Sequence, residues 1–210
     1  TAQTAVLSAY MQATDPKGAE EFLNHLVKYY QQGRLEAPPD LVMHNIVLNA
    51  WAIVASGKRA REFLETMELQ DTISYNTVVQ AYVRERKLDC AKEFALHLVD
   101  LYLQDPGRAC RPDLATFRSI LAGWSRARDS NAAERAEEVL DWTKDLHQQG
   151  VLSDPPDHHC YQLVLDAWIK SKLSHAGDRA EAMLSEMRGA GTKITSSAYL
   201  KAMKSKPKRA

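Results

Sequence analysis

Apolar side chains recur along the chain with the three- and four-residue spacing of an α-helix. Stripes of the form i, i+3, i+4, i+7 span residues 44–51, 75–82, 117–124 and 161–168, the first of them opening on His44. Each stripe ends on a large aromatic residue that directly follows Ala or Gly. This spacing places the stripe on one face of a helix. The pattern therefore predicts a helix with a buried face at each of these four places.

A second helix is predicted after each stripe. It carries an alanine with a bulky residue three positions later, as in Ala60 and Phe63 or Ala91 and Phe94. Most prolines fall between these helices or between successive pairs of them, where a helix has to stop. No alternating pattern of comparable strength predicts a strand. The chain is therefore predicted to form a series of helical hairpins.

Two markers recur along the chain with the same unequal steps from one hairpin to the next. The aromatic residues at the stripe ends are spaced by 41, 31, 42 and 44 residues, and a set of aspartates repeats the last three of these steps. The aromatic residues are Tyr10, Trp51, Tyr82, Trp124 and Trp168, and the aspartates are Asp40, Asp71, Asp113 and Asp157. Two independent markers with one set of steps indicate a true repeat.

Stacked repeats of two helices form an α-solenoid, which binds its ligands along the face lined by one set of helices. We therefore expect an all-α protein, a right-handed α-solenoid over residues 1–195. The start of a further repeat and a basic tail occupy residues 196–210. The predicted repeats lie at about 1–40, 41–71, 72–113, 114–157 and 158–195.

Composition and charge narrow the class of protein. The 210 residues carry 27 Lys and Arg against 27 Asp and Glu, which argues against a uniformly basic nucleic-acid coat. No apolar run reaches the roughly 20 residues that cross a bilayer, so no membrane insertion is expected. The three cysteines are far apart, which disfavours a disulfide scaffold or a zinc module. Because the chain begins at Thr1, we expect a fragment or a processed form of a longer protein.

Residues that commonly bind metals cluster once, at His158, His159 and Cys160, near Asp154 and Asp157. Neighbouring residues on a helix point in different directions, so they rarely bind one ion together. No Gly-rich phosphate loop, HExxH or GxSxG motif is present. We expect no metal site, no cofactor and no catalytic centre within these residues.

Polar side chains directly follow the first residue of several stripes. Asn45 and Asn76 have this place in the second and third repeats, and Thr4 has it in the first. Short polar side chains near a helix start often cap the helix. The recurrence of this residue type in stacked units, together with the aspartate that closes each repeat, favours contact sites along the first helices over isolated caps.

The third repeat resembles a pentatricopeptide repeat. The string from Thr72 to Val79 is similar to the start of such a repeat, and Lys87 to Ala91 resembles its turn into the second helix. The resemblance extends over about residues 1–200. It implies binding of single-stranded RNA, with one base recognised by two or three side chains of each repeat.

The resemblance also implies which residues contact the bases. The residue after the stripe start would act with the residue that closes the repeat, and Val42 and Ile73 match the apolar residue that wedges between bases. Asn–Asp pairs would recognise uracil, because an amide offers both a donor and an acceptor, and the Thr–Asp pair would recognise guanine. Arg118–Asp157 is an unusual pair that is equally compatible with a plain salt bridge. The pairs are Thr4–Asp40, Asn45–Asp71, Asn76–Asp113, Arg118–Asp157 and Gln162–Thr195.

Basic residues lie two and four positions after the stripe-ending aromatic in three consecutive repeats. In the family, the first of these positions runs along the RNA backbone, so the stacked cations would form a seam for phosphates. The helix dipole also favours cations at a helix C-terminus, which is the alternative explanation. The same spacing in three repeats favours phosphate contacts. The six residues of this basic seam are Arg84, Arg86, Arg126, Arg128, Lys170 and Lys172.

Three functions are compatible with these features. The first is single-stranded RNA binding in organellar RNA processing, stability or translation, in a mitochondrion or plastid as the resemblance implies. The second is a structural subunit of a large organellar ribonucleoprotein, such as a ribosome, with contacts to protein or ribosomal RNA. The third is the substrate-binding arm of a nuclease or an editing enzyme, whose catalytic residues would lie outside this sequence.

Overall fold

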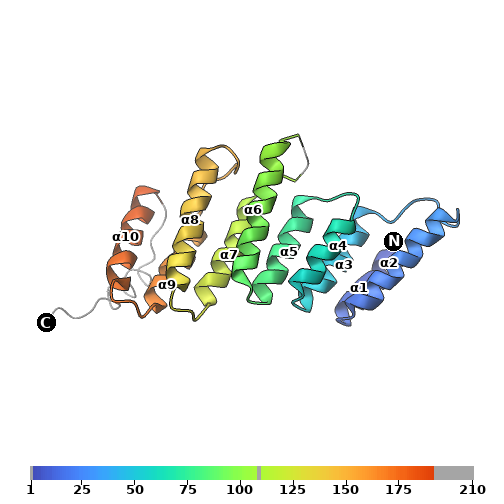
Figure 1. Cartoon of the computed structure of the whole chain (residues 1–210), viewed down its shortest axis with the longest axis horizontal. Coiled ribbons are helices and arrows are strands. Elements are labelled where there is room, and N and C mark those ends of the chain that lie inside the picture. The colour runs from blue at the N-terminus through green and yellow to red at the C-terminus, as the bar shows by residue number, and fades with distance from the viewer. Residues whose placement is uncertain (1, 108–109, 192–210) are drawn as a thin grey trace. The chain divides into compact units, whose positions relative to one another are not determined.

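The computed structural model describes residues 2–107 and 110–191. In these residues the chain forms ten α-helices and no strand, which confirms the predicted all-α fold of helical hairpins (Figure 1). None of the described helices has both the length and the hydrophobicity that crossing a membrane requires. The helices are α1 (Ala2–Gln12), α2 (Pro16–Gln31), α3 (Leu41–Ile53), α4 (Gly57–Thr66), α5 (Thr72–Arg84), α6 (Leu88–Gln104), α7 (Leu114–Arg126), α8 (Ala132–Gln148), α9 (His158–Lys170) and α10 (Ala176–Gly189).

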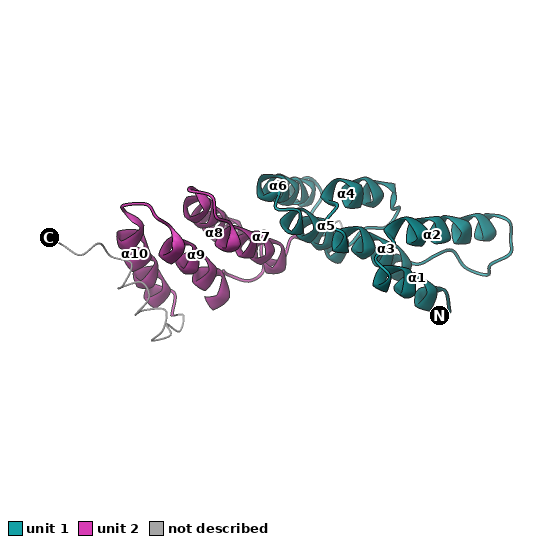
Figure 2. Ribbon diagram, turned by 90° about the horizontal axis from the view of Figure 1, so that it is seen from below, with its two compact units in different colours: residues 1–111 teal, residues 112–210 magenta. Residues whose placement is uncertain are grey.

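The chain divides into two compact units, residues 1–111 and 112–210. In the first unit, α1, α3 and α5 pack side by side and form one layer. The second helices α2, α4 and α6 form another layer that covers one side of the first (Figure 2). In the second unit, α7 packs against α9, α8 packs against both, and α10 packs against α9. In each unit the first helices of consecutive hairpins therefore pack directly against one another.

The apolar stripes form the core of each unit. On α5, Tyr75, Val78, Val79 and Tyr82 are all buried. The corresponding residues of α7 and α9 are buried as well, whereas on α3 His44 is only half-buried. The small residue before the aromatic is also buried on α3, α5, α7 and α9, which allows the neighbouring helix to approach closely, whereas Ala9 on α1 is exposed.

An aspartate caps the start of each first helix from α3 onward. Its side chain accepts a hydrogen bond from the backbone N–H three residues later, which satisfies a donor that the helix itself leaves unpaired. These bonds join Asp40 to Met43 (2.9 Å), Asp71 to Ser74 (2.8 Å), Asp113 to Thr116 (3.1 Å) and Asp157 to Cys160 (3.0 Å). The caps explain the recurrence of aspartate in structural terms, whatever further role these residues have.

A cluster of Glu, Trp and Arg ties consecutive hairpins of the first unit together. The indole Nε1 of Trp51 on α3 donates to Glu20 Oε2 on α2 at 2.8 Å. The guanidinium of Arg59 on α4 lies 5.0 Å from the centre of the Trp51 ring, and its Nη2 lies 3.4 Å from Glu20 Oε2. One glutamate thus holds two elements of the next hairpin.

The second unit contains the same cluster at corresponding repeat positions. Trp168 Nε1 on α9 donates to Glu137 Oε2 on α8 at 2.8 Å, and Arg179 on α10 pairs with Glu137 while lying over the Trp168 ring. Glu137 is more deeply buried than Glu20. One junction between hairpins in each unit is therefore built in the same way.

Candidate functional site

The side chain of Asn45 on α3, the first helix of one hairpin, is hydrogen-bonded at the start of α5, the first helix of the next hairpin. Asn45 Nδ2 lies 3.4 Å from Asp71 Oδ1, so the structure brings together the two members of this predicted pair. Ser74 Oγ lies 2.8 Å from Asn45 Oδ1 and 2.7 Å from Asp71 Oδ1. Asn45, Asp71 and Ser74 thus form one hydrogen-bonded network at the ends of two adjacent first helices.

Ser74 is the member of this network that the sequence-based prediction missed. Its backbone N–H is capped by Asp71 and its hydroxyl accepts from the Asp71 backbone N–H at 3.3 Å, which makes a reciprocal capping box. The signal available in the sequence is a hydroxyl residue three positions after the repeat-closing aspartate. That signal indicates a cap, but it does not by itself indicate a contact with a residue 29 positions earlier.

Thr4–Asp40 and Asn76–Asp113 are the two other predicted pairs that begin in the first unit. Thr4 lies half-buried on α1, and Asp40 is exposed at the cap of α3, the helix on which α1 packs. Asn76 lies half-buried on α5 in the first unit, and Asp113 is the exposed cap of α7 in the second. Their action as base-contacting pairs stays a prediction.

Arg118 and Asp157 form an ion pair in the second unit. Arg118 Nη2 lies 3.5 Å from Asp157 Oδ2, and the side chains are 40% and 41% exposed. Burial alone would raise the pKa of Asp157, but the hydrogen bonds from Cys160 and the positive charge of Arg118 together hold this pKa below its usual value. The carboxylate is therefore ionised at neutral pH, and the geometry supports the salt-bridge alternative for this pair.

The last predicted pair is described only in part. Gln162 Nε2 donates to Asp166 Oδ1, one turn further along α9, at 3.2 Å. Thr195 lies outside the described residues. Gln162 is thus held by its own helix.

The two predicted wedge residues are exposed. Val42 and Ile73 are the second residues of α3 and α5, and 59% and 64% of their surface is open to solvent. The corresponding places on α7 and α9 hold Ala115 and His159. Large apolar side chains at this place are therefore confined to the second and third repeats, and they are accessible to a ligand.

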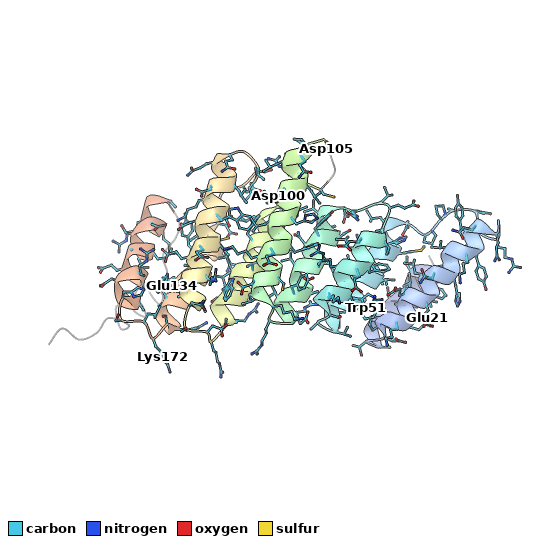
Figure 3. All side chains as sticks on the ribbon, viewed as in Figure 1. Glu21, Trp51, Asp100, Asp105, Glu134 and Lys172 are labelled. Atoms are coloured by element: carbon cyan, nitrogen blue, oxygen red, sulfur yellow. The ribbon has the colours of Figure 1, made fainter. Side chains whose placement is uncertain are left out.

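The basic seam lies at the opposite end of the first helices from the capping aspartates. Arg84, Arg126 and Lys170 are the last residues of α5, α7 and α9, and all six residues of the seam are exposed. Lys172 projects away from the ribbon where α9 turns toward α10 (Figure 3). Lys170 Nζ donates to the carbonyl oxygen of Ser125 in α7 at 3.0 Å, so at this position a helix-end contact also explains the cation.

Potential metal ligands do not converge in the described part of the chain, where no group of three His, Cys, Asp or Glu side chains could hold an ion. Cys160, beside His158 and His159, is buried against the cap of α9. Burial, followed by the hydrogen bond and negative charge of Asp157, raises the pKa of Cys160 to about 12. Its sulfur is therefore a neutral thiol at neutral pH.

Comparison with known proteins matches this architecture to a repeat family. The family model of the PPR repeat matches residues 73–94, which include most of α5 and the start of α6. The crystal structure of the pentatricopeptide repeat protein PPR10 from maize superposes with a TM-score of 0.58 over 96% of this chain, at 23% identity. The chain has the fold of a pentatricopeptide repeat solenoid, and its residues 73–94 match the repeat itself.

Other solved structures of this solenoid class have the same fold. The PPR domain of Arabidopsis thaliana protein-only RNase P 1, solved in complex with tRNA, gives a TM-score of 0.59 at 13% identity and covers 96% of this chain and 95% of that chain. The structure of PPR10 in complex with an 18-nt psaJ RNA element gives a TM-score of 0.54 at 21% identity, and the match covers 96% of this chain and 30% of that chain. In the crystal structure of PPR10 from maize with the TM-score of 0.58, the match covers only 26% of the PPR10 chain. No curated protein sequence matches the chain.

Proposed function

We propose that this pentatricopeptide repeat solenoid binds single-stranded RNA along its first helices, with a preference set by a few bases. The observation that carries the proposal is the Asn45 amide, which Asp71 and Ser74 hold at the ends of two adjacent first helices. The exposed Val42 and Ile73 stand in the first turns of the same two helices. The solved structures of PPR10 with an RNA element and of the RNase P domain with tRNA support RNA as the ligand.

The chemistry of Asn45 fits a pyrimidine base. An amide has two N–H donors and two acceptor lone pairs, and the network with Asp71 and Ser74 uses one donor and one lone pair. One donor and one acceptor remain for a ligand, which matches the mixed donor and acceptor edge of uracil. An aliphatic side chain such as Ile73 offers a surface on which a base can rest.

The RNA element that we propose is recognised is only about three bases long. The pairs of the first three repeats correspond to a 5′-GUU-like element, whereas the Arg118–Asp157 ion pair contributes no base contact in the fourth. Affinity comes mainly from the basic seam, whose cations would contact phosphates without regard to sequence. We place this binding in organellar RNA processing, stability or translation, in a mitochondrion or plastid, and we assign no cleavage of RNA to these repeats.

Binding of short RNAs at several salt concentrations tests this function. Fluorescence anisotropy should show binding to a single-stranded RNA that contains GUU, with a log–log salt slope of about −2 to −4 for roughly three to six phosphate contacts. Replacing Asn45 and Asn76 by Ala should reduce the preference for uracil, whereas replacing Arg84 and Arg126 by Gln should weaken binding to all sequences alike.

A cation on the other face supplies the control for these variants. Lys58 is a highly exposed residue of α4, a second helix, so Lys58→Gln should leave RNA affinity unchanged. Absence of RNA binding by the unsubstituted chain at low salt would refute the proposed function.

A structural role in an organellar ribonucleoprotein is the second candidate. Its supporting observation is a set of exposed apolar or aromatic side chains on the second helices: Tyr29 and Tyr30 on α2, and Leu96 and Leu103 on α6. Such side chains are available for contact with protein. A complex with partner proteins that survives nuclease treatment would favour this role over RNA reading.

A further inference from the structure

The third residue of each first helix varies with the predicted base-contacting residue of the repeat before it. A hydroxyl residue follows each repeat that carries Asn, and a residue without a hydroxyl follows the others. Ser74 follows Asn45, Thr116 follows Asn76, Met43 follows Thr4, and Cys160 follows Arg118. All four of these third residues are capped through their backbone N–H by an aspartate, so the cap alone does not require a hydroxyl.

The surroundings of Ser74 show what its hydroxyl does. The residue is 0% exposed, and its Oγ lies 2.8 Å from Asn45 Oδ1. The direct contact between Asn45 Nδ2 and Asp71 Oδ1 is longer, at 3.4 Å. The closest hydrogen-bond partner of the Asn45 amide is therefore the buried hydroxyl.

The two partners together favour one orientation of the amide. Asp71 carries a carboxylate, which has no proton to donate, so it can face only the Nδ2 end of Asn45. The Ser74 hydroxyl has one proton, which Asn45 Oδ1 at 2.8 Å shares with Asp71 Oδ1 at 2.7 Å, so it donates to the oxygen end of the amide. If the amide rotated by half a turn, its oxygen would face the carboxylate oxygen and Nδ2 would instead donate to the Ser74 hydroxyl, so only the observed orientation keeps a bond to both partners.

We propose that Ser74 is a positioning residue for base recognition, because together with Asp71 it fixes the order of donor and acceptor that the Asn45 amide presents to RNA. Uracil carries a donor at N3, where cytosine carries an acceptor, and an acceptor at O4, where cytosine carries a donor. An amide held in one orientation distinguishes the two bases, and an amide that rotates freely fits both. This inference rests on the proposed RNA binding and adds a third residue to the Asn45–Asp71 pair.

The variants Ser74→Ala and Ser74→Thr test the inference. Alanine removes the hydroxyl but keeps the backbone N–H that Asp71 caps, so α5 should still begin at the same place. Threonine keeps a hydroxyl at this position, and Thr116 shows that such a hydroxyl can reach the capping carboxylate, with Oγ1 3.2 Å from Asp113 Oδ1. A thermal unfolding midpoint near that of the unsubstituted chain confirms that each variant is folded.

The first measurement is the ratio of dissociation constants for two single-stranded RNAs that differ only as GUU and GCU. Loss of one hydrogen bond predicts that Ser74→Ala reduces the preference for uracil by about three- to tenfold, while Ser74→Thr retains it. An unchanged ratio in Ser74→Ala, with the preference present in the unsubstituted chain, overturns the positioning role and leaves RNA binding intact. Absence of the preference in the unsubstituted chain overturns base recognition at this repeat, and the positioning role with it.

The second measurement needs no RNA. The side-chain amide of Asn45 gives an NMR signal whose order parameter reports how firmly the group is held. We expect a lower order parameter in Ser74→Ala and an unchanged one in Ser74→Thr. An Asn45 amide that is equally ordered in Ser74→Ala shows that Asp71 alone holds it, which overturns the proposal independently of any failure to bind RNA.

Discussion

Three residues other than glycine adopt a left-handed backbone where the first helices of unit 1 turn into the second helices. They are Thr14, Ala55 and Arg86, with φ of 54°, 52° and 61°. After α3 the turn is closed by hydrogen bonds from Ala55 N to Ala52 O and from Ser56 N to Trp51 O, the pattern of a Schellman motif. Glycine is the favoured residue at this place, because a side chain there costs about 1–2 kcal/mol. Arg86 carries this strain as Thr14 and Ala55 do, and it is also a residue of the predicted basic seam.

Glycine substitutions at these turns separate backbone strain from RNA contact. Ala55→Gly should raise the free energy of unfolding by about 0.5–1 kcal/mol, because relief of strain exceeds the added freedom of the unfolded chain. Arg86→Gly should stabilise the protein by a similar amount while weakening RNA binding. Urea unfolding and anisotropy titration measure the two effects. If Arg86→Gly bound RNA as tightly as the unsubstituted chain, Arg86 would not contact phosphate.

At the scale of the helices, a Glu–Trp–Arg cluster ties one pair of consecutive hairpins together in each unit. Glu137→Ala should lower the free energy of unfolding by about 2–4 kcal/mol, because it leaves the buried indole N–H of Trp168 and the charge of Arg179 without their partner. Glu20→Ala removes the matching, more exposed residue and should cost about 1–2 kcal/mol. Chemical denaturation compares the two variants. Equal losses would show that burial of the glutamate does not set the strength of this junction.

Close packing of α4 against α5 depends on Gly57. A Cβ atom added there would lie 2.3 Å from Cδ1 of the Tyr82 ring, and the backbone N–H of Gly57 donates to Glu85 Oε2 at 3.0 Å. Gly57→Ala should therefore destabilise the protein by about 1–3 kcal/mol, as the ring is forced to move. Gly189→Ala in α10 is the matched control, because nothing lies within 4 Å of its added Cβ, and it should be neutral or slightly stabilising. A neutral Gly57→Ala would mean that α4 and α5 shift apart at little cost.

Local patterns predicted the helices well, because each apolar stripe lies within one helix and each capping aspartate acts on its own first turn. The stripe Tyr75, Val78, Val79 and Tyr82 is buried as the spacing indicates. Contacts between repeats were harder to foresee. The bond from Ser74 to Asn45 and the bond from Lys170 to Ser125 join residues 29 and 45 positions apart, and their geometry depends on how neighbouring helices pack.

At the scale of the whole chain, the net charge of zero hides an uneven distribution. Residues 1–187 contain 20 Lys and Arg against 27 Asp and Glu, and residues 188–210 contain seven Lys and Arg and no acid. Acidic residues such as Glu21, Asp100, Asp105 and Glu134 lie on or directly after second helices (Figure 3), while the basic seam ends the first helices of three hairpins. A chain without net charge can therefore still offer a local surface for phosphates.

Neutralising the basic tail tests whether the phosphate contacts come from the basic seam or from the tail. Replacing Lys201, Lys204, Lys206, Lys208 and Arg209 by Gln in the full chain lowers its net charge by five. If the seam supplies the phosphate contacts, the log–log salt slope of RNA binding should change by less than about 1, because that slope counts contacts and not net charge. Association should become slower at low salt, since long-range steering depends on the charge of the whole molecule. A slope that falls close to zero would assign the phosphate contacts to the tail, and the matched replacement of Arg84, Arg126 and Arg128 would then leave the slope unchanged.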